Sequence, residues 1–130
     1  VDLKFALVMA FSEAKEALAS VTDYLPNYRE VHDNLAQLVR LHGSSVSERI
    51  HHTNLERMIN KALRVPTGSR KQLPPATRSA IAVAERIASV ACEQALHTGQ
   101  DHKAAYQKAK TGVVNYAKTV VPILPILECD

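Results

Sequence analysis

The sequence predicts an all-α protein, a single domain over residues 1–130 built as an antiparallel up-and-down bundle of about five helices. Apolar residues recur at helical spacing along most of the chain, and no stretch alternates convincingly between apolar and polar residues as a strand would. The stretch 80–96 is apolar around most of its circumference, which is typical of a helix surrounded by other helices. A composition of 46% hydrophobic and 22% charged residues is that of a globular protein.

The first two helices are predicted on either side of a proline. An alanine-rich helix is expected over residues 2–21, where Leu, Ala and Val recur at helical spacing. A turn follows over residues 22–27, because Pro26 disfavours a helical conformation in the residue before it. The second helix is expected from about Asn27 to Leu41, and Gly43 ends it in the left-handed conformation that glycine tolerates.

A third helix is expected to begin at Ser44–Ser45 and to extend to about Leu63. Ser45 and Glu48 have the spacing of a capping box, in which two side chains each accept a backbone N–H at the start of a helix. Residues 65–75 then interrupt the helical pattern with three prolines and a glycine. This basic, proline-rich connector is long for a compact domain, so it either crosses the bundle or serves a function of its own.

The second half of the chain is predicted to hold the central helix and the last one. The central helix, Ala76–His97, is rich in alanine, which lets neighbouring helices approach closely, and Gly99 closes it. Asp101 caps the next helix, which continues to about Val121. The proline-broken apolar tail, residues 122–127, is expected to lie as an extended strip along a groove.

The net charge of +3 conceals an asymmetry that suggests a partner. Residues 1–56 carry net charge −3, whereas residues 57–127 carry net charge +8. The predicted anion-binding or partner-binding residues are Arg57, Lys61, Arg64, Arg70, Lys71, Arg78, Lys103, Lys110 and Lys118. Their cations beside a helix N-terminus favour phosphate, an acidic membrane surface or an acidic protein segment. The alternative is that these side chains are only solvated.

The histidines and cysteines do not form a convincing metal or catalytic pattern. His52 has helical i, i+4 spacing to Glu48 and to Glu56, but no second matching pair follows, so we expect surface or capping histidines and no metal. Cys92 is expected to be a buried and inert thiol, and Cys129 lies one residue from the end of the sequence. A disulfide between them, or between two copies of Cys129, is the alternative to reduced thiols.

No glycine-rich phosphate loop, nucleophile elbow or cofactor motif is present in the sequence, so we expect neither an enzyme nor a cofactor. The primary hypothesis is a soluble, non-enzymatic interaction module that binds a protein partner, or associates with itself, through an alanine-lined helical face. The alternative is binding of nucleic acid or an acidic membrane through the basic surface of residues 57–118. No apolar run approaches the roughly 18 residues of a membrane span, and a cytoplasmic location is favoured.

Overall fold

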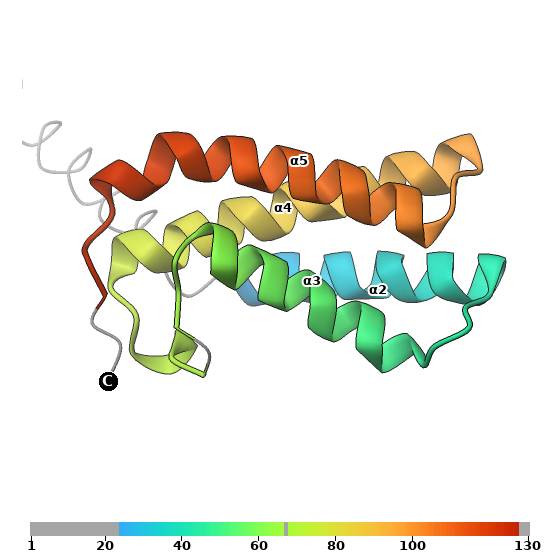
Figure 1. The fold of residues 1–130 in the computed structure, drawn as a ribbon, viewed down its shortest axis with the longest axis horizontal. Helices are drawn as coiled ribbons and strands as arrows, with labels where there is room; N and C mark the ends of the chain where they lie inside the picture. Colours follow the sequence, from blue (N-terminus) through green and yellow to red (C-terminus); the bar gives the residue numbers. More distant parts are fainter. Residues whose placement is uncertain (1–23, 67, 128–130) are drawn as a thin grey trace, which may run out of the picture.

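The computed structural model describes residues 24–66 and 68–127, and within these residues all regular structure is helical (Figure 1). Its elements in chain order are α2 (Tyr24–His42), α3 (Glu48–Ala62), the 3-10 helix η1 (Arg70–Gln72), α4 (Pro75–Thr98), α5 (His102–Val120) and the 3-10 helix η2 (Val121–Ile123). The all-α class is therefore confirmed. Four α-helices pack together in the described residues rather than about five, and the helix predicted over residues 2–21 lies outside them.

The four α-helices alternate in direction along the chain, which is the up-and-down arrangement that the sequence predicts (Figure 1). The longest helix, α4, packs extensively against α2 on one side and α5 on the other. Helix α3 runs obliquely across the bundle and makes fewer contacts with each of the other three helices. The prediction that residues 76–97 form the central helix is confirmed, with one residue more at each end.

Small side chains explain why α4 takes the central position. Five alanines along it, at positions 80, 84, 88, 91 and 95, are almost completely buried, together with Cys92. Alanines of α5 at positions 105, 109 and 117 are buried against them, so two backbones approach closely along the α4–α5 interface. Larger apolar residues of α2 and α3, such as Leu38 and Ile59, fill the remaining volume.

Several predicted helix ends are confirmed. Gly43 and Gly99 both have positive φ (77° and 74°), the left-handed conformation that follows a helix C-terminus. The Asp101 carboxylate accepts a hydrogen bond from the Ala104 backbone N–H at 2.9 Å, so it caps α5. Pro74 and Pro75 begin α4, where proline has the required φ and no intrahelical hydrogen bond is lost.

Two predicted helix starts are wrong. Residues 24–26, expected in a turn, are already helical in α2, where Pro26 is accommodated. Helix α3 begins at Glu48 without a side-chain cap, so the predicted capping box of Ser45 does not form. The hydroxyl of Ser44 instead accepts a hydrogen bond from the Val46 N–H in a local turn.

The faces of α4 and the C-terminal tail also differ from the prediction. Glu85 and Ser89, expected on the polar face of the central helix, are fully buried, whereas Val83 and Val90 are 41% and 36% exposed. The tail contacts the core only through the half-buried Leu124 and Leu127, and Ile126 is almost entirely exposed. Helix α4 thus buries a face that carries both apolar and polar side chains, and its buried polar side chains contact residues of other elements.

No α-helix in the described residues is long and apolar enough to cross a membrane.

Candidate functional site

A cationic groove follows the line where α3 faces α5. Its central hollow, about 460 Å³ in volume, has an apolar floor that includes Met58 and Val114, with Tyr106 beside it. Arg57 and Lys61 line it from α3, and Lys110 lines it from α5. A groove with an apolar floor and cationic sides can contact one ligand in two ways, through apolar packing on the floor and through ion pairs along the sides.

The groove continues beyond this hollow in both directions. One neighbouring hollow, about 200 Å³, shares Ala62 and Val114 with the first and adds Arg64 and Lys118. The other, about 280 Å³, shares Asn54 and Tyr106 and adds Lys103, with His51 and His102 at its far end. No carboxylate is among the described residues that line these three hollows.

Six of the nine predicted binding residues therefore lie along one groove. They are Arg57, Lys61, Arg64, Lys103, Lys110 and Lys118. Arg78 is half-buried at the start of α4 and does not line these hollows, and the side chain of Lys71 lies outside the described part of the structure. The expectation that Arg70 belongs to this surface is not met, because its guanidinium is bound inside the bundle.

Arg64 occupies an unfavourable backbone conformation at one end of the groove. It has φ of 57°, the only positive value among the described non-glycine residues. Its N–H donates to the Lys61 carbonyl, and the Val65 N–H donates to the Asn60 carbonyl, which together form a Schellman motif after α3. Glycine is the favoured residue at this position, so the arginine is retained there at a conformational cost.

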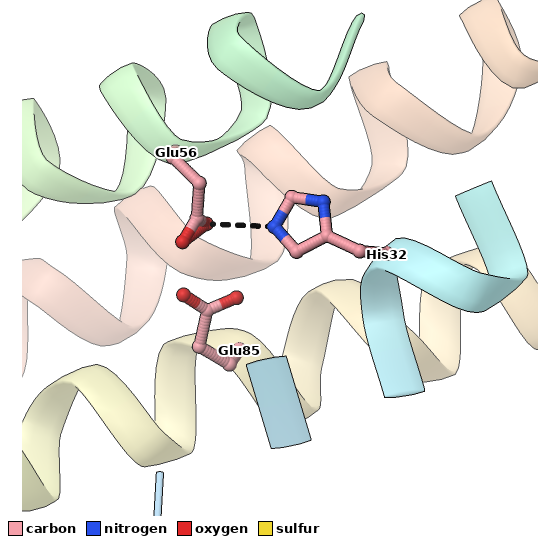
Figure 2. A group of neighbouring side chains, drawn as sticks. All are labelled: His32, Glu56 and Glu85. Carbon is pink, nitrogen blue, oxygen red and sulfur yellow. Dashed lines mark ion pairs between the residues drawn. The ribbon is translucent and has the colours of Figure 1, made fainter. Parts of the chain in front are cut away.

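A second polar feature lies inside the bundle and is largely excluded from solvent. Figure 2 shows His32 from α2, Glu56 from α3 and Glu85 from α4 pointing toward one another. Arg70 reaches this buried cluster from the connector, and its Nη1 donates to Glu56 at 2.9 Å and to Glu85 at 3.2 Å. Its Nε and Nη2 donate to the Asn60 side chain at 3.1 and 2.8 Å. Arg70 thus links the connector to α3 and α4 through polar contacts, in addition to the buried Val65 and Leu73.

The two carboxyl groups of the cluster titrate in opposite directions. Burial, together with the neighbouring Glu56 carboxyl group and its charge, raises the pKa of Glu85 to about 10. Burial alone would also raise the pKa of Glu56, but the polar side chains of His32 and Glu85 beside it, and the charge of Arg70, lower it. At neutral pH the pair therefore holds one proton and one negative charge.

The sequence did not predict this buried cluster, because its members lie far apart along the chain and no local pattern relates them. Glu85 has polar neighbours at helical spacing, and a lone carboxylate in such a pattern is normally a surface residue. The weak signal was Arg70, a cation in an otherwise proline-rich and glycine-containing connector. Among the six histidines that were expected at the surface, His32 is largely buried and His102 is only 4% exposed.

Cys92 behaves as the sequence predicts. It is a free thiol, 2% exposed, and burial raises its pKa to about 11, with the Glu93 carboxylate adding to the shift. Such a thiol is not a nucleophile at neutral pH. Cys129, for which a disulfide was considered, lies outside the described residues.

Comparison of the chain with protein-family models, with curated proteins and with solved structures found no match.

Proposed function

We propose that this protein is a non-enzymatic interaction module that binds an acidic, amphipathic helical segment of a protein partner in the cationic groove. The observation that carries the proposal is the continuous groove between α3 and α5, which combines an apolar floor with six cationic residues. An amphipathic helix inserts its apolar side chains into such a floor while its carboxylates pair with the sides.

Within the described residues, the alanine-lined faces of α4 and α5 do not supply this surface. The alanines of α4 are mostly buried in the core, and those of α5 at positions 105, 109 and 117 are buried as well. The proposed partner-binding face is therefore the side of α5 that faces α3, where Lys103 and Lys110 line the groove.

The apolar floor favours an acidic protein segment over nucleic acid. A phosphate backbone pairs with cations and gains little from Met58 and Val114, whereas an amphipathic helix needs apolar anchors. Single-stranded nucleic acid binds by stacking bases on aromatic side chains, and Tyr106 is the one tyrosine that lines the three described hollows. Preferential binding of nucleic acid or of an acidic membrane is the alternative outcome of the binding test.

The test is a binding measurement with the full chain and three probes of similar charge. The probes are a labelled amphipathic peptide rich in Glu and Leu, a single-stranded oligonucleotide, and vesicles containing phosphatidylserine. We expect the peptide to bind more tightly than the other two, and its affinity to fall as salt is raised from about 50 to 200 mM. A peptide in which Lys replaces every Glu should not bind.

Two double variants distinguish the contribution of the groove to peptide affinity from the contribution of the protein's overall positive charge. Lys61→Glu with Lys110→Glu reverses two charges in the groove, and we expect at least a tenfold loss of peptide affinity. Arg29→Glu with Lys108→Glu makes the same change of net charge on exposed residues that do not line the groove, and should lower affinity only slightly. Equal losses in both pairs, or tighter binding of the oligonucleotide or vesicles, would contradict the proposal.

A further inference from the structure

Three buried polar atoms that make no hydrogen bond of ordinary geometry converge in the cluster of Figure 2, where an ion-pair contact of 3.5 Å joins His32 Nε2 and Glu56 Oε2. They are His32 Nε2, Glu56 Oε2 and Glu85 Oε2, and they come from three different helices. The Glu85 side chain is completely buried, so water outside the protein does not reach its unpaired oxygen. Buried polar atoms normally have partners, and a group of three that face one another indicates a missing electropositive group between them.

Arg70 does not fill this role, because it is bound to the other oxygen of each carboxylate. Its Nη1 donates to Oε1 of Glu56 and to Oε1 of Glu85, which orients the two Oε2 atoms. The pair of carboxylates and the single guanidinium carry a net charge of −1 when both carboxylates are ionised. A buried site with excess negative charge attracts either protons or a metal cation.

The neighbouring histidine determines which His32 nitrogen is available. His32 Nδ1 lies 2.6 Å from His52 Nδ1, and His52 Nε2 lies 3.4 Å from a Glu48 oxygen. Because the Glu48 carboxylate only accepts hydrogen bonds, the proton of His52 is placed on Nε2, and His52 Nδ1 then accepts from His32 Nδ1–H. This tautomer leaves a lone pair on His32 Nε2, directed at the Glu56 carboxylate 3.5 Å away.

We propose that His32, Glu56 and Glu85 form a three-ligand site for a divalent first-row metal cation, with Zn²⁺ as its simplest occupant. One imidazole nitrogen and two carboxylate oxygens are ligands that zinc accepts at about 2.0–2.2 Å. Such bond lengths in a tetrahedral site separate two ligands by about 3.4 Å, close to the present distance between His32 and Glu56. The three ligand atoms lie within 4.8 Å of one another, so a small movement of Glu85 completes the geometry.

The surroundings of the three ligands match those of a metal site. Each ligand is held by a second group, Arg70 for the two carboxylates and His52 for the imidazole, as ligands of bound metals usually are. A surface hollow of about 620 Å³, lined by His52 and Glu56, opens beside the cluster and offers a path for the cation. A metal here would join α2, α3 and α4.

The proposal is tested by titrating ZnCl₂ into the full chain after treatment with a chelator. Calorimetry, together with competition against a chromogenic zinc chelator, should give one tight site per chain. Replacement of zinc by Co²⁺ should give visible absorption bands from a low-symmetry site, which a surface-adsorbed ion does not give. No tight site in the wild-type chain at neutral pH would overturn the proposal, because protons alone would then satisfy the cluster.

Two variants locate the ion. Glu85→Gln keeps the size of the side chain and removes one ligand, so we expect at least a hundredfold loss of Zn²⁺ affinity with the helical circular dichroism unchanged. His51→Gln removes a histidine from a separate close pair, His51 and His102, that lies outside the cluster, and should leave the affinity unchanged. An unchanged affinity in Glu85→Gln, or a loss in His51→Gln, would place zinc elsewhere and overturn the proposal. If Glu85→Gln does not fold, His32→Gln decides by the same criterion.

Discussion

Gly112 of α5 lies directly against the Cγ2 methyl of Ile87 in α4, so closely that a Cβ atom at residue 112 would fall 2.7 Å from that methyl. Glycine normally weakens a helix interior by roughly 1 kcal/mol relative to alanine. Here it permits the close approach of two helices, and the cost in helix propensity is offset by their packing.

The variant Gly112→Ala should therefore destabilise the protein, although alanine favours helix formation. The clash involves a methyl on the branched Cβ of Ile87, which moves little, and overpacking of this kind costs about 1–3 kcal/mol. Urea unfolding measures the effect. In the Ile87→Ala background, where the methyl is absent, the same substitution should become neutral or stabilising. Stabilisation by Gly112→Ala alone would contradict the close contact.

Arg64 provides a prediction that links stability to binding. Arg64→Gly should stabilise the chain by about 1 kcal/mol, because glycine adopts the left-handed conformation without the steric cost of a side chain. The same change removes one cation from the cationic groove, so affinity for an acidic peptide should fall. Arg64→Ala, which loses the charge and keeps the strain, should weaken binding without the gain in stability.

Arg70 is expected to matter more for stability than any cation of the groove. Arg70→Met removes the partner of two buried carboxylates, which is the kind of change that costs about 3 kcal/mol or more. Arg64→Met is the matched control, because Arg64 is exposed. Equal unfolding free energies in the two variants would show that the buried ion pairs contribute little.

Stability should decrease with rising pH because of Glu85. The folded state holds the Glu85 proton up to a pKa of about 10, whereas the unfolded chain releases it near its ordinary value of 4.5. Between these values the unfolded state binds fewer protons, so the free energy of unfolding falls with pH by at most about 1.4 kcal/mol per unit. This loss is complete once pH exceeds about 10.

The variant Glu85→Gln isolates that contribution. Glutamine does not ionise, so the decline in unfolding free energy between pH 6 and pH 9, measured in urea with a chelator present, should become shallower. Glu93→Gln, on the same helix and 40% exposed, should leave the slope unchanged. A slope that is identical in the wild type and Glu85→Gln would show that Glu85 is ionised in the folded protein.

The sequence predicted those features of the fold that depend on residues close to one another along a single helix. Alanines at helical spacing identified α4 as central, and Asp101 was recognised as a cap because its partner, Ala104, is three residues away. The position of Glu85 was missed because its partners are Arg70, on the connector, and Glu56, on another helix. Periodicity describes one helix at a time and carries no information on such pairings.

The candidate groove was predicted as a set of residues rather than as a shape. Charge counting identified Lys61 and Lys110, because cations without nearby carboxylates are visible in the sequence. It also included Arg70, because an arginine that pairs with distant glutamates has the same local pattern as an exposed one. The predicted capping box of Ser45 and Glu48 does not form, and the reason is local, since Ser44 and Val46 form a turn that competes with it.

The unequal packing of α3 suggests how this molecule opens. Helix α4 packs extensively against both α2 and α5, whereas α3 packs less against α4 and is joined to the bundle partly through Glu56. In amide hydrogen exchange, α3 should therefore lose protection first, as one cooperative unit, while α4 exchanges last. A helix held in the cationic groove and a cation on Glu56 both attach to α3 and would slow the same opening event, so each would favour the other without touching it.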